Sequence, residues 1–246
     1  MYRIGLFALT YTRYVTTSPT PRRRIVAWVG VGGLGGLILG LSAALLVRAP
    51  IEDDGRLTLT VPDGQILHVA VVGDTLADGY YATTEELGYR ALVLDELPVA
   101  VEEAPVLDIG DRVPADTPVG LIPSTTDLVV LEVGTHDAFV TPVEEFGSHY
   151  EDLVAVITEE SPNAEIVCLG VWGNADAART MDPLIGAACR EAGGAFVPLF
   201  DLFGDPELRG PAGTATFLGD SDDFHPNDAG HRAIADRVLD RLKVVS

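Results

Sequence analysis

Short apolar runs alternate with helix-like segments over residues 66–243, and this alternation limits the fold more than any other feature of the sequence. The apolar runs cover residues 66–72, 106–109, 128–133, 166–172 and 195–200. The segments with helical spacing of apolar residues cover 80–97, 142–160, 177–192 and the stretch from Pro226 to about Lys243. Strands that alternate with helices in this way build a parallel sheet between helical layers. The sequence therefore predicts a five-stranded parallel sheet, with the strand that contains Pro198 at an edge.

The charged residues are distributed unevenly along the chain. Residues 1–24 carry five Arg and no acidic residue, whereas residues 48–246 carry eleven Lys or Arg and thirty-seven Asp or Glu, a balance of −26. A body this acidic repels phosphate groups, which argues against nucleic acid and anionic lipid surfaces as partners. Acidic surfaces usually serve solubility, so the charge alone indicates no binding partner.

Between these two regions, residues 25–47 form an apolar run of 23 residues without a charge. As a helix it would be about 34 Å long at ~1.5 Å per residue, enough to cross a bilayer core of about 30 Å. The cluster Arg22, Arg23 and Arg24 precedes it, which predicts a cytoplasmic N-terminus and an extracellular or periplasmic C-terminal domain. The alternative is a cleaved signal peptide and a secreted protein, but the run is longer than the usual ~7 to 15 residues and lacks a clean cleavage site.

The expected organisation has four regions. They are a basic cytoplasmic tail (1–24), a transmembrane anchor (25–47), a stalk (48–65) and a folded domain (66–246). Alternating apolar residues at 57–61 suggest a small hairpin within the stalk.

Two further features of the sequence leave alternatives open. Gly32, Gly36 and Gly40 are four residues apart and could form a close helix–helix seam, so a homodimer through the span is one hypothesis. The only cysteines are Cys168, in a predicted strand, and Cys189, in the following helix. They could form a disulfide or stay as two buried thiols, because spacing alone does not show whether their Cβ atoms face each other.

Polar residues follow the predicted strands at one edge of the sheet. Residues 73–75 (Gly-Asp-Thr) follow the first strand and residues 134–137 (Gly-Thr-His-Asp) follow the third. In open α/β sheets the ligand site lies beyond the carboxyl ends of these two strands. Residues 222–227, with an aspartate three residues before a histidine, open at the same edge. A hydroxyl, an imidazole and a carboxylate are the groups that acyl transfer requires. The predicted catalytic residues are Thr75, His225 and Asp222.

These segments resemble the sequence blocks of the SGNH (GDSL-type) hydrolases, in the same order. Residues 73–76 (Gly-Asp-Thr-Leu) are similar to the family's Gly-Asp-Ser-Leu block, residues 134–137 to its Gly-x-Asn-Asp block, and residues 222–227 to its last block. The resemblance covers about residues 66–243. It implies a three-layer α/β/α, flavodoxin-like fold and ester hydrolysis through an acyl intermediate on Thr75, without a metal or cofactor. For an anchored extracytoplasmic enzyme, acyl or acetyl esters of envelope lipids or glycans are the expected substrates.

The resemblance also implies an oxyanion hole. Its donors would be the backbone N–H of Thr75, a glycine N–H that is best matched by Gly110, and the side chain of His136. Asp74 and Asp137 are implied as supporting residues.

Two positions depart from the family pattern. Thr75 stands where the family has Ser, and its methyl group crowds the attacking oxygen. His136 stands where the family has Asn, and an imidazole donates a hydrogen bond only in the right tautomer or charge state. A catalytically degenerate domain that binds glycan or lipid is therefore the alternative, and an acyltransferase would use the same residues as a hydrolase. Structural roles are also open for residues 73–75 as a capping turn and for His136, and Asp223 could replace Asp222.

Overall fold

The computed structural model describes residues 55–98, 100–103, 107–110, 112–118, 120 and 122–245. Within these residues, no helix has the length and apolar character needed to cross a membrane. The expected basic tail, the expected span at 25–47 and its three glycines lie outside them.

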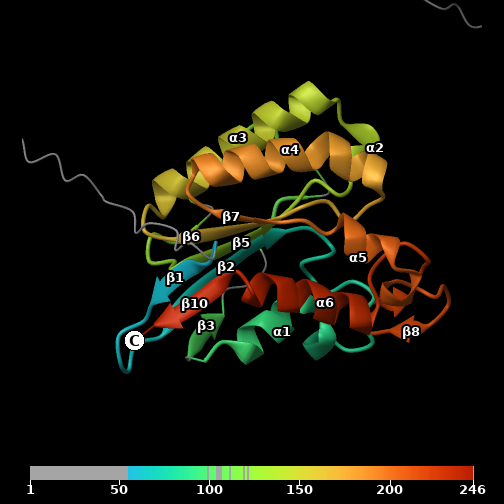
Figure 1. Ribbon diagram of the computed structural model, residues 1–246, viewed down its shortest axis with the longest axis horizontal. Coiled ribbons are helices and arrows are strands. Elements are labelled where there is room, and N and C mark those ends of the chain that lie inside the picture. The colour runs from blue at the N-terminus through green and yellow to red at the C-terminus, as the bar shows by residue number, and fades with distance from the viewer. Residues whose placement is uncertain are drawn as a thin grey trace, which may run out of the picture. The chain divides into compact units, whose positions relative to one another are not determined.

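The central sheet is parallel and has five positions across its width (Figure 1). Four positions hold β2 (Leu67–Gly73), β5 (Leu128–Glu132), β6 (Glu165–Leu169) and β7 (Ala195–Val197). Two short strands, β3 (Val101–Glu103) and β4 (Leu107–Asp108), share the fifth position beside β2. The order β3/β4-β2-β5-β6-β7 confirms the predicted sheet and places the reversal of chain order between β2 and β5. The edge position of β7 also agrees with the prediction.

Helices cover both faces of this sheet (Figure 1). On one face lie α1 (Tyr89–Glu96) and α6 (Asp228–Leu239), and on the other lie α3 (Val143–Glu160) and α4 (Ala175–Glu191). Each face packs its own apolar core against the sheet. Strand β5 is buried at every position, which is expected of a central strand covered on both faces.

Short elements connect these layers. They are η1 (Glu85–Leu87), α2 (Asp137–Val140), α5 (Phe200–Gly204), η2 (Pro206–Leu208), β8 (Ala215–Thr216) and β9 (Gly219–Asp220). Strands β8 and β9 pair with each other in the loop before α6.

A second small sheet differs from the sequence expectation. Strand β1 (Leu57–Thr60) pairs in parallel with β10 (Leu242–Val245) at the end of the chain. Residues 57–60 therefore belong to the folded domain instead of a stalk, and the expected local hairpin is wrong. The last helix ends at Leu239, not near Lys243, because the chain extends there to form β10. Alternating apolar residues show that a strand forms but do not show that its partner lies at the other end of the sequence.

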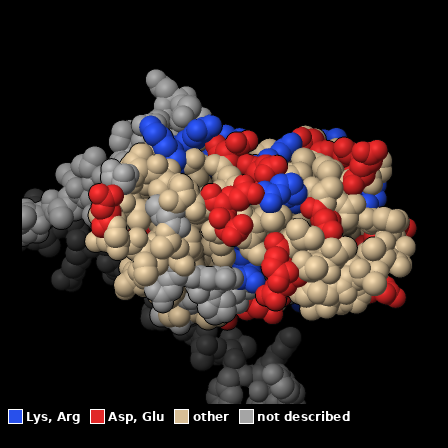
Figure 2. Space-filling view, turned by 90° about the horizontal axis from the view of Figure 1, so that it is seen from below, with Lys and Arg blue, Asp and Glu red and all other residues tan. Residues whose placement is uncertain are grey.

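Two other expectations concern the cysteines and the surface. Cys168 in β6 and Cys189 in α4 form a disulfide with their Cα atoms 6.1 Å apart, which decides between the two alternatives that the sequence left open. On the face seen in Figure 2, acidic side chains outnumber basic ones, in line with the composition of the chain.

Candidate active site

Three loops at the carboxyl edge of the sheet enclose a pocket of about 400 Å³. The loop after β2 contributes Asp74, Thr75 and Leu76, the loop after β5 contributes Thr135 and His136, and the loop before α6 contributes Asp222, Phe224 and His225. Phe139 of α2 and Trp172, which follows β6, complete the lining. The structure thus brings together the three segments that the sequence singled out.

Asp222 and His225 form a hydrogen-bonded pair. His225 Nδ1 lies 2.8 Å from Asp222 Oδ2, and Asp222 Oδ1 accepts hydrogen bonds from the backbone N–H groups of Phe224 (2.9 Å) and His225 (2.8 Å). Partial burial raises the pKa of Asp222, but the hydrogen bonds from His225 and Phe224 outweigh it and hold this pKa below its ordinary value. An ionised Asp222 fixes the proton on Nδ1, which leaves Nε2 of His225 able to accept one.

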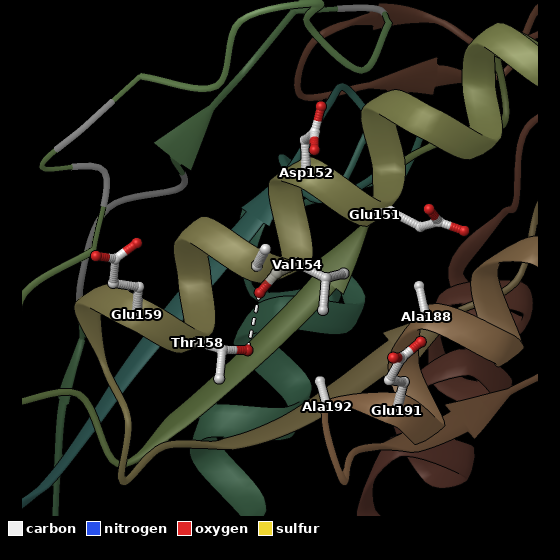
Figure 3. Close-up of a pocket in the computed structure, with 9 residues that line it drawn as sticks. Glu151, Asp152, Val154, Thr158, Glu159, Ala188, Glu191 and Ala192 are labelled. Carbon is white, nitrogen blue, oxygen red and sulfur yellow. Dashed lines mark hydrogen bonds between the residues drawn. The ribbon is translucent and has the colours of Figure 1, made fainter. Parts of the chain in front are cut away.

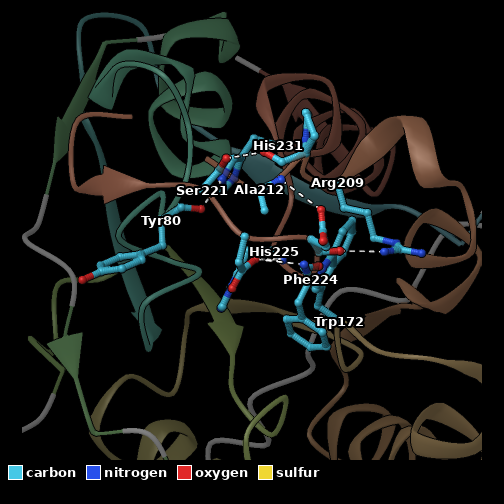
Figure 4. A network of polar contacts seen from close by, with 11 residues as sticks. Tyr80, Trp172, Arg209, Ala212, Ser221, Phe224, His225 and His231 are labelled. Carbon is cyan, nitrogen blue, oxygen red and sulfur yellow. Dashed lines mark hydrogen bonds and ion pairs between the residues drawn. The ribbon is translucent and has the colours of Figure 1, made fainter. Parts of the chain in front are cut away.

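The neighbouring Asp223 has a different task. Its Oδ1 accepts a hydrogen bond from the Ala212 N–H (2.9 Å), and its carbonyl accepts one from Arg209 Nη1 (2.6 Å) (Figure 4). These contacts fix the loop that leads into α6. Asp222, and not Asp223, is therefore the carboxylate on His225.

The His225 ring is enclosed by aromatic rings. The ring centroids of Tyr81 and Phe224 lie 4.7 Å and 5.1 Å from that of His225. Tyr81 has a left-handed backbone with φ of +69°, which costs energy for a bulky residue and points to a functional constraint. Its ring restricts the rotation of the imidazole.

Thr75 lies in the turn that follows β2. Asp74 Oδ1 accepts a hydrogen bond from the Leu76 N–H (3.0 Å), and the Thr75 carbonyl accepts one from the Tyr80 N–H (3.0 Å). Among the described residues, the Thr75 N–H has no acceptor, and no hydrogen bond joins the Thr75 hydroxyl to His225. Both side chains line the same pocket, and catalytic hydrogen bonds are often long until substrate binds.

The other expected oxyanion residues divide into two groups. The exposed side chain of His136 lines the pocket. Gly110 is exposed, does not line the pocket, and donates its N–H to Asp108 Oδ1 (2.7 Å). The structure therefore gives no geometric basis for Gly110 as an oxyanion donor. Its loop carried no local signal of where it would lie relative to the site.

Asp137 is buried and supports the site from behind. Its Oδ2 accepts a hydrogen bond from the Val113 N–H (3.0 Å), and its Oδ1 accepts one from the Thr141 hydroxyl (2.5 Å). Asp137 therefore anchors the turn that carries His136.

Comparison with known proteins identifies the family. Residues 71–233 match the model of the GDSL-like lipase/acylhydrolase family. The chain belongs to this family. The family is described as one of lipases and acylhydrolases, and the SGNH resemblance is confirmed. None of the curated proteins matches this GDSL-like hydrolase.

Solved structures share the fold of this GDSL-like hydrolase at low sequence identity. An extracellular lipase from Streptomyces rimosus is 15% identical with a TM-score of 0.54, and the match covers 70% of this chain and 98% of that one. An acetyl-xylooligosaccharide esterase from Geobacillus is 18% identical with a TM-score of 0.53, over 75% and 96% of the two chains. A two-domain esterase active on acetylated mannans is 20% identical with a TM-score of 0.53, over 72% and 49%. This chain spans about half of that esterase and 62% of a family two carbohydrate esterase from Clostridium thermocellum.

Trp172 joins the loops of the site. It is fully buried, its Nε1–H donates to the Phe224 carbonyl (2.8 Å), and its backbone N–H donates to Thr135 Oγ1 (2.9 Å). Its ring also packs edge-on against Phe203. Trp172 thus connects the loops that carry His136 and His225 and forms the floor of the pocket.

A larger hollow lies elsewhere on the hydrolase, on the outer surface between α3 and α4 (Figure 3). Its volume is about 540 Å³, and its acidic lining residues are Glu151, Asp152, Glu159 and Glu191. It contains no histidine, so we do not assign the chemistry to it. Within the described part of the chain, no group of three or more His, Cys, Asp or Glu residues is arranged to hold a metal ion.

Proposed function

We propose that this chain is a membrane-anchored, extracytoplasmic esterase that hydrolyses acyl or acetyl esters through Thr75, His225 and Asp222. The observation that carries the proposal is the Asp222–His225 pair, which lies in one pocket with the hydroxyl of Thr75. A carboxylate-oriented imidazole beside a hydroxyl is the arrangement that nucleophilic acyl transfer needs.

The reaction would proceed in two steps. In the first, Thr75 Oγ1 attacks the ester carbonyl carbon while His225 Nε2 takes the hydroxyl proton. The resulting oxyanion accepts hydrogen bonds from the Thr75 N–H and from His136. When this intermediate collapses, His225 returns the proton to the leaving alcohol and an acyl-Thr75 ester remains. In the second step a water molecule gives a proton to His225 and attacks the carbonyl carbon of this ester. When the second intermediate collapses, His225 returns that proton to Thr75 Oγ1, and the carboxylic acid is released.

The lining of the pocket favours a neutral ester. None of the described lining residues is Lys or Arg, and Leu76, Phe139, Trp172 and Phe224 present apolar surface. The acidic body of the protein would repel an anionic substrate, and the described lining of the pocket offers that substrate no cation. Acyl or acetyl esters of envelope lipids or glycans satisfy these requirements. Structurally similar proteins include a lipase and esterases active on acetylated sugars.

Three features support the proposed location. They are the apolar run at 25–47, the preceding arginines, and the disulfide between Cys168 and Cys189, which is typical of proteins outside the cytoplasm.

A catalytically degenerate binding domain is the second candidate. The observation that favours it is the pair of departures from the family pattern, Thr75 and His136, at the two positions closest to the reaction. Acyl transfer to another hydroxyl would need no further residue.

Hydrolysis of p-nitrophenyl acetate and butyrate by the full chain in detergent tests the proposal. We expect turnover by the wild type, loss in Thr75→Ala and His225→Ala, and no change in the control Thr158→Ala, whose hydroxyl bonds the Val154 carbonyl on α3. Equal turnover by wild type and Thr75→Ala would exclude Thr75 as nucleophile. An inactive wild type together with an active Thr75→Ser variant would favour the binding domain.

A further inference from the structure

A buried acid lies directly behind the proposed nucleophile. Glu132 is the last residue of β5 and is only 1% exposed. In the ladder between β2 and β5 it pairs with Gly73. A Cβ atom on Gly73 would lie 2.9 Å from the Glu132 carbonyl oxygen and 3.5 Å from Glu132 Oε2. The Glu132 side chain is therefore packed against the main chain just before Asp74 and Thr75.

Among the described residues, no Lys or Arg acts on the ionisation of this acid. The polar groups that act on its ionisation are the carboxyl group of Asp74, which is itself only 7% exposed, the hydroxyl of Thr135 and the backbone N–H of Asp74. Glu132 contributes to the raised pKa values of the buried phenols of Tyr89 on α1 and Tyr150 on α3, so both phenols lie within range of its charge. Neither Glu132 oxygen makes a regular hydrogen bond to another described residue. Burial, followed by the neighbouring Asp74, raises the pKa of Glu132 well above its usual range. Burial disfavours the charged form of a carboxyl group that has neither a cation nor enough hydrogen-bond donors, so Glu132 favours its neutral form.

We propose that Glu132 is a positioning residue that, as a neutral acid, gives its proton in a hydrogen bond to the Asp74 carboxylate and so fixes the nucleophile turn. Asp74 already accepts the Leu76 N–H through Oδ1. A second donor on the same carboxylate would hold Asp74 between two fixed groups. Thr75 lies between Asp74 and Leu76, so its N–H and hydroxyl would be held in place. This inference rests on the proposed role of Thr75.

The arrangement also has a consequence for pH. When Glu132 ionises, its negative charge and that of Asp74 share one buried site. The charges repel, and the turn moves away from its active geometry. Activity should therefore fall at alkaline pH.

Two variants of similar size distinguish positioning from packing. Glu132→Gln keeps a donor toward Asp74, whereas Glu132→Met keeps the volume and removes the donor. With the full chain in detergent, we expect Glu132→Gln to retain most of the wild-type kcat. We also expect the kcat/KM of this variant not to fall at alkaline pH. We expect Glu132→Met to lower kcat by about 10²-fold, as a small misplacement of reacting groups does. The control Glu160→Gln alters a carboxylate that bonds the Ile122 N–H at the end of α3, and should leave both quantities unchanged.

A second readout does not depend on catalysis. An acid whose pKa is raised by folding stabilises the fold at low pH and ceases to do so as the pH rises through its folded pKa. The urea midpoint of the wild type should therefore fall relative to that of Glu132→Gln between pH 4.5 and pH 9. Equal kcat in the Gln and Met variants, or parallel urea midpoints of wild type and Gln variant, would overturn the inference. If wild type and Thr75→Ala hydrolyse the ester equally, the proposed function fails, and the urea series alone decides the state of Glu132.

Discussion

The two halves of the site are built in different ways. The base half of the site, Asp222 and His225, lies within four residues. The Asp222 carboxylate accepts three hydrogen bonds from Phe224 and His225. Both side chains stay partly exposed, at 42% for Asp222 and 26% for His225. The nucleophile half depends on a residue 58 positions away, since Glu132 is buried behind Asp74. Local hydrogen bonds thus determine the base, whereas burial in the tertiary structure determines the turn that carries Thr75.

The largest effect should come from the base half. Removing a positioned general base usually costs 10²- to 10⁴-fold, so His225→Ala and Asp222→Ala should each lower kcat by about 10³-fold or more. Because the two residues act as a unit, the double variant should lose little more than either single variant. Steady-state ester hydrolysis measures this. Asp223→Asn is the matched control, and an equal loss there would move the role of orienting carboxylate to Asp223.

The next largest effect should come from His136, in the half of the site that carries the nucleophile. Loss of one oxyanion donor typically costs about 10² to 10³ in kcat, and we expect this from His136→Ala. His136→Asn restores the family's neutral amide and should match or exceed the wild type. Unchanged kcat in His136→Ala, with the fold verified by circular dichroism, would show that His136 is not an oxyanion donor.

His231 joins the two halves and should set the acid stability of the domain. It is fully buried in α6, its Nε2 lies 2.9 Å from the Tyr80 carbonyl, and its Nδ1 accepts the Tyr89 N–H at 3.3 Å. Burial lowers the pKa of His231 from 6.5 to about 4. The unfolded chain therefore binds a proton first, and stability is lost as the pH falls from about 6.5 to 4, by about 3 kcal/mol in total.

Urea unfolding between pH 7 and pH 4 checks this expectation. The wild type should lose more stability than His231→Gln over this range, whereas His149→Gln on α3 should follow the wild type. If the free energy of unfolding falls equally with pH in the wild type and in His231→Gln, His231 does not set the acid stability of the domain.

The smallest effect concerns the methyl group of Thr75. A serine removes the methyl group that crowds the attacking oxygen. The restriction that this methyl group places on the side-chain rotamers costs about 0.5 to 1.5 kcal/mol. Thr75→Ser should therefore raise kcat by about 2- to 10-fold, measured with the same esters. A lower kcat would mean that the pocket is shaped around the methyl group.

The same contrast explains what the sequence could predict. The strand and helix alternation predicted the sheet, and the turn at Asp222 could be predicted because the hydrogen bonds to the Asp222 carboxylate all come from within four residues. The pairing of β1 with β10 and the pairing of β4, which leads to Gly110, with β2 join segments distant in sequence, and no local pattern encodes them. Glu132 did leave a signal, since it is the one acid in an otherwise apolar strand. Its role became visible only when the structure placed it beside Gly73.

The most direct test of the proposed role of Thr75 is to label the nucleophile covalently. The full chain in detergent would be treated with a p-nitrophenyl phosphonate ester, which mimics the tetrahedral intermediate, and its peptides would be mapped by mass spectrometry. The account predicts one adduct on the peptide that contains Thr75, formed at a rate that falls sharply in His225→Ala. Ester hydrolysis by a protein whose adduct lies on another residue, or that forms no adduct at Thr75, would contradict it.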